Sequence, residues 1–287
     1  MTDLSAEQST AIDLALAALD RCEDFVIKGR AGTGKSRLIK ALLHKLPGSV
    51  VAAPTHKACG VLKTYGVPAV TLHAALGISV VKYGYGYGSS DIDDGLVFGP
   101  ATKYLMCPLI VDECSLVGSQ MHKDLSNNAI GGVIYVGDPY QLPPVGEYES
   151  APFKNTLGYE LTEVFRGHMY TRLRRLCQYV LNVLTGDEMW SIETFKYWMV
   201  AGRDSSVVIP ARDEYLPYDV FLTYTNRRAE CLPYGLTVHS AQGSEWNVVM
   251  VDLNHILKAT NDMMFNLRLL YVALTRANET AIIYTVE

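Results

Sequence analysis

The sequence predicts an α/β fold with two domains, each built on a parallel β-sheet. Short apolar strands alternate with amphipathic helices along the chain, and this alternation indicates parallel strands joined by crossover helices. A glycine-rich loop, GRAGTGKS (29–36), stands between the first predicted strand and the helix that follows it. The alternation begins again in the second half of the 287 residues, so we expect a second sheet there.

The first domain, expected over residues 1–155, opens with a helix. Ser5 and Gln8 occupy the two positions of a capping box, and apolar residues recur from Ile12 to Leu19, Leu14 among them. Parallel strands and a helix that stops at Pro47-Gly48 follow. The strands are predicted at 25–28, 49–53, 108–113 and 132–138, and the helix at 36–46.

A small β-hairpin insertion is predicted in the first domain at about 78–100. Residues 78–98 contain a strand, a glycine-rich turn and a second strand. Tyr83, Tyr85 and Tyr87 alternate with glycines in that turn. Two interpretations stay open: a solvated surface loop, or a tongue whose tyrosines stack on unpaired bases.

The second domain is expected over residues 156–287, after the boundary segment PPVGEYESAP (143–152). Its apolar runs have the length of buried strands, and two longer amphipathic stretches have the length of helices. Strands are predicted at 205–210, 219–225, 236–239, 247–253 and 280–286, and helices at 169–185 and 263–275.

Composition and charge restrict the classes of protein that the chain can belong to. Apolar residues make up 49% and charged residues 19%, as in a globular protein with a substantial core. A net charge of −5 means that any nucleic-acid surface must be a local groove. We find no cationic leader and no apolar run of membrane length, and six scattered cysteines predict reduced thiols. We therefore expect a cytoplasmic protein without a membrane partner, or one in the host-cell cytoplasm if the source is a phage or virus.

The glycine-rich loop has the spacing of a phosphate-binding P-loop, G-x-x-x-x-G-K-[ST]. It follows a strand and opens a helix, so its backbone N–H groups can surround a phosphate. Lys35 can reach the β- and γ-phosphates of a nucleotide, and Ser36 can coordinate Mg²⁺. The predicted nucleotide-binding residues of the loop are Gly29, Ala31, Gly32, Thr33, Gly34, Lys35 and Ser36.

Two further strand ends supply groups that a phosphate site requires. LIVDECS (109–115) ends an apolar strand in two acids, so Asp112 is predicted to hold Mg²⁺ and Glu113 to polarise the attacking water. VGDPYQLPPV (136–145) places Gln141 near the γ-phosphate, because carboxyl ends of parallel strands meet along one edge. Alone, the acids could cap a helix and the prolines could close a domain; beside a P-loop they indicate an NTP hydrolase.

Together with five more segments, these motifs resemble superfamily 1 helicases, in their RecD-like and Dda-like branch. Residues 29–36, 112–115 and 137–145 are similar to motifs I, II and III. The resemblance implies two RecA-like P-loop NTPase domains that use ATP and Mg²⁺. The other segments are APTHKA (53–58), TLHAALG (71–77), LTEVFR (161–166), TVHSAQGSEW (237–246) and YVALTRA (271–277), similar to motifs Ia, Ib, IV, V and VI.

The resemblance also assigns roles to residues outside the P-loop. Gln8 matches the glutamine that reads adenine, although it also suits a capping box. Arg166 and Arg276 match two arginines that reach the γ-phosphate from the second domain, where they would stabilise transition-state charge. Gly243 and Glu245 match the part of motif V near the nucleotide sugar.

A nucleic-acid strand would cross both domains in such a helicase. Thr55, His56, Lys57 and His73 in the first domain correspond to Thr237, His239 and Ser240 in the second. Hydroxyl and imidazole groups suit phosphate contacts that carry no base identity. Each histidine by itself could equally be a structural hydrogen-bonding residue.

Three departures from the family pattern are visible. Motif IV often continues Arg-Gln, whereas this chain has Arg166 followed by Gly167, and Cys114 stands where small or β-branched residues are familiar. Relatives commonly insert an SH3-like β module before motif V. Here only residues 229–236 connect TYTNRR to TVHSAQG, so we expect a compact form with a weaker grip on DNA.

The resemblance implies an ATP-dependent DNA helicase or translocase that moves 5′ to 3′ on single-stranded DNA. Expected partners are single-stranded and forked duplex DNA, with RNA as an alternative; replication or recombination proteins could bind a monomeric helicase. One alternative is an RNA helicase like those of positive-strand RNA viruses. Another is a nucleic-acid-stimulated ATPase that does not unwind, although Lys35, Glu113 and Gln141 are all retained.

Overall fold

The computed structural model describes residues 4–81, 97–165, 172–201, 205–209 and 216–285. The chain forms two compact units. Unit 1 comprises Met1–Gly29, Lys35–Gly137 and Pro143–Thr162. Unit 2 comprises Arg30–Gly34, Asp138–Leu142 and Glu163–Glu287, so it includes the turn of the P-loop and the part of motif III that follows Gly137.

Unit 1 is built on a six-stranded sheet in the order β3-β2-β6-β7-β1-β8, and all neighbouring strands are parallel. Strands of such a sheet are apolar throughout because both faces are covered. The strands are β1 (Phe25–Gly29), β2 (Val50–Ala53), β3 (Val70–Thr71), β6 (Leu109–Val111), β7 (Val133–Gly137) and β8 (Gly158–Leu161).

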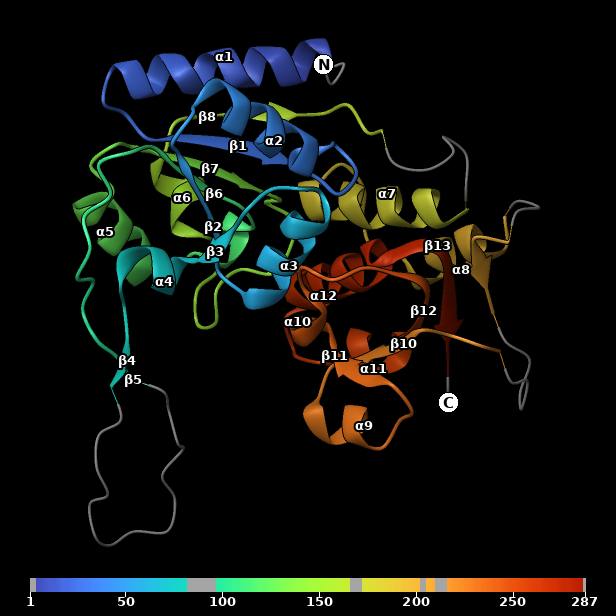
Figure 1. Cartoon of the computed structure of the whole chain (residues 1–287). Helices are drawn as coiled ribbons and strands as arrows, with labels where there is room; N and C mark the ends of the chain where they lie inside the picture. Colours follow the sequence, from blue (N-terminus) through green and yellow to red (C-terminus); the bar gives the residue numbers. More distant parts are fainter. Residues whose placement is uncertain (1–3, 82–96, 166–171, 202–204, 210–215, 286–287) are drawn as a thin grey trace, which may run out of the picture. The chain divides into compact units, whose positions relative to one another are not determined.

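Helices cover both faces of the unit 1 sheet (Figure 1). On β1, Ile27 packs with helices α1, α2 and α3, whereas its neighbour Val26 packs toward α4, α5 and α6. This alternation follows from the two-residue repeat of a strand. The helices are α1 (Ala6–Asp20), α2 (Lys35–Lys45), α3 (His56–Thr64), α4 (Leu72–Leu76), the 3₁₀ turn η1 (Cys114–Leu116), α5 (Ser119–Asn128) and α6 (Ala151–Asn155).

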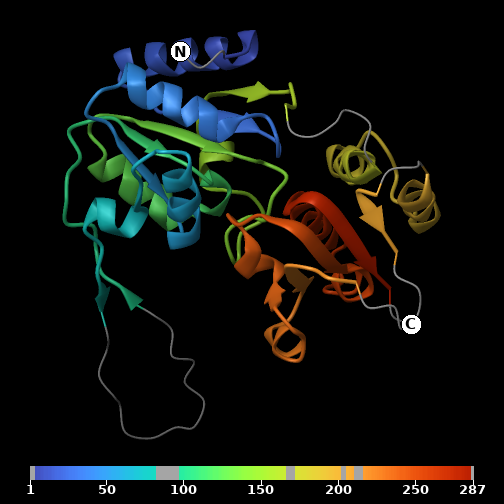
Figure 2. The same ribbon diagram turned by 45° about the vertical axis from the view of Figure 1, so that its right-hand side comes forward.

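The base of the predicted hairpin insertion is a separate antiparallel pair, β4 (Val80–Val81) and β5 (Val97–Phe98). In both views the pair extends away from the six-stranded sheet (Figures 1 and 2). The glycine-rich turn with Tyr83, Tyr85 and Tyr87 lies outside the described residues.

Unit 2 is built on a five-stranded parallel sheet in the order β11-β10-β12-β13-β9. Its strands are β9 (Val207–Val208), β10 (Val220–Thr223), β11 (Gly235–Thr237), β12 (Trp246–Asp252) and β13 (Ala277–Tyr284). Its helices are α7 (Arg172–Thr185), α8 (Ile192–Val200), α9 (Asn226–Glu230), α10 (Val238–Ala241), α11 (Leu253–Leu257) and α12 (Met263–Thr275).

The two faces of the unit 2 sheet are covered unequally. Leu222, Val251 and Ile283 share a large core with α7, α8, α10, α11 and α12. Among the described residues, the opposite face carries a small buried cluster of Phe221, Met250 and Ile282, with partly buried apolar residues packed against it. Figure 2 shows α7 and α8 side by side on unit 2. No helix within the described ranges is long and apolar enough to cross a membrane.

The predicted α/β fold with parallel sheets is confirmed, but two details of the prediction were wrong. The first sheet does not end at residue 155, because Gly158–Leu161 forms its edge strand β8 beside β1. The strand predicted at 236–239 ends at Thr237, whose side chain caps helix α10, so Val238 and His239 are helical. Between β10 and β11 the chain has only the five-residue α9 and a turn.

Candidate nucleotide site and strand-binding edges

The P-loop turn is shaped by glycine and by its own side chains. Gly32 and Gly34 have φ values of 86° and 79°, a left-handed conformation that glycine adopts without strain. The Thr33 hydroxyl is buried and donates to the Arg30 carbonyl at 2.9 Å. Lys35 Nζ donates to the Gly29 carbonyl at 2.7 Å, so the ammonium group folds back over the loop.

Asp112 and Glu113 follow strand β6 in unit 1. Glu113 has φ 50° and ψ 41°, a strained conformation for a residue with a side chain. Its Oε2 atom is buried and has no hydrogen-bond partner in the structure. Burial, then the neighbouring Glu113 carboxylate, raises the pKa of Asp112 to about 7, while Lys35 opposes the shift. Lys35, Asp112 and Glu113 therefore lie within electrostatic reach of one another.

The buried acids fit a divalent cation. An unpartnered carboxylate oxygen in a buried site is costly unless a cation, a donor or water satisfies it. Among the described residues, no group of three or more His, Cys, Asp or Glu side chains is arranged to hold a metal. Mg²⁺ keeps several waters and needs few protein ligands, so Asp112 and Ser36 would suffice with ATP oxygens.

We expect Mg²⁺ to stabilise the chain more at about pH 8 than at about pH 6. The pKa of Asp112 is raised to about 7 in the folded chain, so the folded state binds the Asp112 proton more tightly than the unfolded state does. Protonated Asp112 therefore stabilises the fold at low pH, and this contribution is lost as the pH rises through about 7. Mg²⁺ must displace that proton, so its affinity should fall about tenfold per pH unit below the pKa. Thermal unfolding with and without Mg²⁺ measures the effect. Asp112→Asn should remove the pH dependence of the Mg²⁺ effect. An equal rise of the unfolding temperature with Mg²⁺ at both pH values would contradict the prediction.

A glycine allows β7 to pass close to the acidic turn. A Cβ atom at Gly137 would lie 2.7 Å from Sγ and 3.0 Å from the backbone nitrogen of Cys114. Such distances are too short for any side chain, so Gly137 is required where motif III approaches motif II. Burial is the first of the causes that raise the pKa of the Cys114 thiol, with Asp112 and Glu113 adding to it.

Gln8 lies in the capping box of α1. Its Oε1 accepts from the Ser5 backbone N–H at 3.2 Å, and Ser5 Oγ accepts from the Gln8 N–H at 3.3 Å. The residue is buried and makes a further interaction as well. The structure therefore places Gln8 in the cap, and adenine recognition stays a prediction.

Within unit 2, helix α12 contacts both the P-loop turn and the motif III segment. Tyr271 Oη accepts from the Ala31 N–H at 3.2 Å and donates to Asp138 Oδ2 at 3.1 Å. Arg268 donates to the Gln141 carbonyl at 2.9 Å. Gln141 itself is buried, and its Oε1 has no hydrogen-bond partner. Sequence reasoning missed Arg268 and Tyr271 as site residues, although Tyr271 is the first residue of the motif VI segment and Arg268 lies three positions before it.

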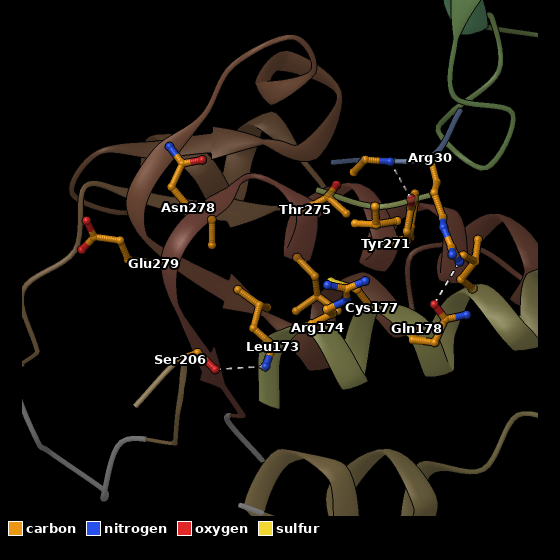
Figure 3. Close-up of a pocket in the computed structure, with 15 residues that line it drawn as sticks. Arg30, Leu173, Arg174, Cys177, Gln178, Ser206, Tyr271, Thr275, Asn278 and Glu279 are labelled. Carbon is orange, nitrogen blue, oxygen red and sulfur yellow. Dashed lines mark hydrogen bonds between the residues drawn. The ribbon is translucent and has the colours of Figure 1, made fainter. Parts of the chain in front are cut away.

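A cavity of about 310 Å³ opens beside these contacts (Figure 3). Residues of α7, of the end of α12 and of the start of β13 line it, together with Arg30 and Ala31 of the P-loop turn, Val164 and Ser206. Figure 3 shows Tyr271 bonded to the P-loop backbone, and Arg30 Nη1 donating to Gln178 Oε1 at 2.9 Å. Because Thr275 and Ala277 line it, the cavity lies at the same end of the sheet as Arg276.

Arg276 faces the interior of unit 2. It is 4% exposed, and its guanidinium donates to the carbonyls of Val272 and Ser244 and to Thr275 Oγ1 at 3.2–3.3 Å. The Arg276 carbonyl in turn accepts from the Trp246 N–H at 3.0 Å. Glu245 therefore lies between Ser244 and Trp246, which are both hydrogen-bonded to Arg276, at the amino end of β12. Just before it, Gly243 turns the chain with φ 70°. This supports a joint role for motifs V and VI.

The other end of motif V lies at the carboxyl edge of the same sheet. Thr237 pairs in register with Thr223, accepts from the Ser240 N–H at 3.1 Å and donates to Ser240 Oγ at 2.9 Å. The His239 ring centroid lies 6.2 Å from that of Tyr224. Burial lowers the pKa of His239, so its imidazole is neutral near pH 7 and offers hydrogen bonds or stacking rather than charge.

Tyr224 and His239 belong to a larger aromatic group that sequence reasoning missed. Phe265 lies 6.1 Å from His239, and His255 lies 6.3 Å from Tyr224, measured between ring centroids. Rings with an accessible face can stack on bases without reading their sequence. Tyr224 could have been found from its place near the carboxyl end of the strand predicted at 219–225, whereas Phe265 carries no local signal.

In unit 1 the predicted strand-binding residues lie after two neighbouring strands. Thr55 accepts from the Ala58 N–H at 3.1 Å and caps α3, which places His56 and Lys57 in its first turn. Thr71 caps α4 in the same way, and α4 holds His73. A threonine hydroxyl that accepts a capping bond still has a proton to donate to a phosphate.

His73 contacts the base of the hairpin insertion. Its ring centroid lies 4.4 Å from that of Phe98 on β5, and Phe98 is 47% exposed. Burial lowers the pKa of His73, so the pair is an uncharged aromatic surface. Phe98 was not predicted as a site residue. Arg166, like the three tyrosines of the hairpin turn, lies outside the described residues.

Comparison with known families agrees with this arrangement. A family model described as an AAA domain matches residues 3–190, and one described as a UvrD-like helicase C-terminal domain matches residues 233–284. An uncharacterized protein of Acanthamoeba polyphaga mimivirus is 29% identical over 196 residues, which are 58% of this chain and 39% of that protein. The ATP-dependent DNA helicase PIF1 of Homo sapiens is 32% identical over 167 residues, or 52% of this chain and 24% of that protein. The matches thus span well under half of either relative.

Solved structures show the same fold. Bacteroides Pif1 bound to ssDNA has a TM-score of 0.62 at 16% identity, covering 99% of this chain and 92% of that one. Pif1 helicase from Candida albicans has a TM-score of 0.60 at 17% identity, with coverages of 100% and 96%. Since the AAA domain match covers more than half of the chain and a helicase C-terminal match follows it in order, the chain belongs to the AAA domain family and to the superfamily 1 helicases of the Pif1/RecD-like type.

Proposed function

We propose that the chain is an ATP-dependent DNA helicase that couples Mg²⁺-ATP hydrolysis to movement along single-stranded DNA in the 5′-to-3′ direction. Bound Mg²⁺ would neutralise charge on the phosphates. Lys35 would hold the β- and γ-phosphates, Asp112 and Ser36 would hold the metal, and Glu113 would accept a proton from the attacking water. Forked duplex DNA would be the substrate for unwinding.

One observation carries the step from ATPase to motor: the two ends of motif V lie at opposite edges of the unit 2 sheet. Thr237 and His239 stand at the carboxyl edge with the aromatic group, while Glu245 lies beside Arg276 at the amino edge. The seven residues 238–244, which include α10, join Thr237 to Glu245. A movement of the residues that contact the nucleotide would therefore be transmitted through this short, largely buried segment to the residues that contact the DNA strand.

The strand-binding surface in this proposal depends little on charge. The chain is net negative, and burial lowers the pKa values of His73 and His239. Stacking and short polar contacts would supply the affinity, which should then depend less steeply on salt than phosphate pairing by lysines and arginines would.

The decisive experiment measures ATP hydrolysis by the purified chain with single-stranded DNA or with RNA of the same sequence. We expect DNA to stimulate hydrolysis more strongly than RNA. Unwinding of 5′-tailed and 3′-tailed DNA duplexes then tests direction, and only the 5′-tailed duplex should be opened. Stronger stimulation by RNA would favour an RNA helicase. Stimulation without unwinding of either duplex would instead indicate an ATPase that only binds or moves along a strand.

A further inference from the structure

Arg268 and Tyr271 of α12 together contact the two segments of unit 2 that come from the P-loop turn (30–34) and from motif III (138–142). Arg268 and Tyr271 stand three positions apart, so they lie on the same side of the helix. Arg268 Nη1 donates to the Pro139 carbonyl at 2.7 Å and to the Gln141 carbonyl at 2.9 Å. None of the roles assigned above to the P-loop, the two acids or the arginine of motif VI uses these two side chains.

Tyr271 links the P-loop turn to Asp138. The residue is 2% exposed, and its hydroxyl lies between the Ala31 N–H and Asp138 Oδ2. Burial and the Asp138 carboxylate raise the pKa of the phenol well above its usual value, so the hydroxyl keeps its proton. The direction of both bonds is then fixed: Tyr271 accepts from the P-loop and donates to Asp138.

Gln141 depends on its backbone for its position. Its side-chain Oε1 is buried without a hydrogen-bond partner. Its own N–H donates to the Asp138 carbonyl at 3.3 Å, and its carbonyl accepts from Arg268. The position of Gln141 therefore depends on two sets of hydrogen bonds. Its N–H bonds to Asp138, whose side chain accepts from Tyr271, and Arg268 donates to the carbonyls of Pro139 and Gln141.

We propose that Arg268 and Tyr271 are positioning residues that set the Gln141 amide relative to the P-loop turn. The inference rests on the proposed function, because it takes Gln141 as the group that senses the γ-phosphate. A displacement of the P-loop turn on nucleotide binding reaches Asp138 and Gln141 through Tyr271, and reaches Arg276 along the same helix.

The kinetic test uses Tyr271→Phe and Arg268→Met, which remove the donors but keep most of the side-chain volume. We expect each to lower kcat for ATP about tenfold and to change KM for ATP less than about threefold. In a Gln141→Ala background neither should lower kcat further, because the effect passes through Gln141. The proposal would be overturned if kcat of the double variants fell by the product of the two single-variant reductions.

Tyr179→Phe is the matched control for loss of a buried hydroxyl. Tyr179 lies in the same core on α7, and its hydroxyl accepts from the Ser191 N–H at 2.7 Å, away from the motif segments. It should lower the unfolding temperature about as much as Tyr271→Phe without changing kcat. A kcat loss as large as that of Tyr271→Phe would show a general stability effect and refute positioning.

Hydrogen exchange tests the same contacts without any turnover. In the nucleotide-free chain, Tyr271→Phe should increase deuterium uptake at Ala31 and across 138–141, and Tyr179→Phe should not. Unchanged uptake at both places overturns the inference. If the unaltered chain hydrolyses no ATP, the proposed function fails, while the uptake measurement still decides whether Tyr271 holds the two segments.

Discussion

Glu113→Gln should lower ATP turnover by about 10²–10⁴-fold and leave nucleotide binding intact. The amide has the size and shape of the carboxyl group but cannot accept a proton from water. The Glu113 Oε2 atom is buried and without a hydrogen-bond partner, so it has no visible structural contact to lose. Steady-state hydrolysis with single-stranded DNA and equilibrium binding of ATP measure the two quantities separately.

An exposed carboxylate provides the control for this variant. Glu149 lies on the surface of unit 1, and Glu149→Gln should leave turnover unchanged. If Glu113→Gln retains more than about a tenth of the normal rate, a second group activates the water. Loss of ATP binding in Glu113→Gln would instead mean that Glu113 holds the metal together with Asp112.

Arg276→Ala should abolish DNA-stimulated hydrolysis, with a loss of about 10³-fold or more if the guanidinium meets the transferred phosphate. It should also reduce stability by about 1–3 kcal/mol, because the Val272 and Ser244 carbonyls lose their donor in a buried site. Hydrolysis with and without DNA measures the first effect, and denaturant unfolding measures the second.

Arg276→Lys separates the two effects of the arginine. A lysine keeps the positive charge but cannot donate in three fixed directions, so part of the stability should return while stimulation stays low. Full stimulation with lysine would mean that charge alone suffices. Persistence of DNA stimulation in Arg276→Ala would remove Arg276 from the nucleotide site and leave it a structural residue that joins motifs V and VI.

Much of the fold could be predicted because its signals are local. The apolar runs at 25–28 and 132–138 became β1 and β7 within one residue at each end, and 263–275 became α12. Helix α1 and strand β8 were harder to predict in detail. The buried side of α1 is formed by small residues such as Ala11 and Ala15, whereas Leu14 is exposed. Strand β8 carries no long apolar run, and its pairing with β1 decides its place.

The sequence by itself determined the chemistry: a P-loop lysine, two acids after a strand, and the ordered motifs that identify the family. Such patterns are readable because their members are close in the chain and their spacing is fixed by strands and turns. Only the tertiary structure decided that Tyr271 bonds Ala31, 240 residues away, and Asp138, 133 residues away. It also turned Arg276 inward and gathered four aromatic rings beside Thr237. Contacts between distant residues depend on how sheets and helices pack, and no local pattern encodes them.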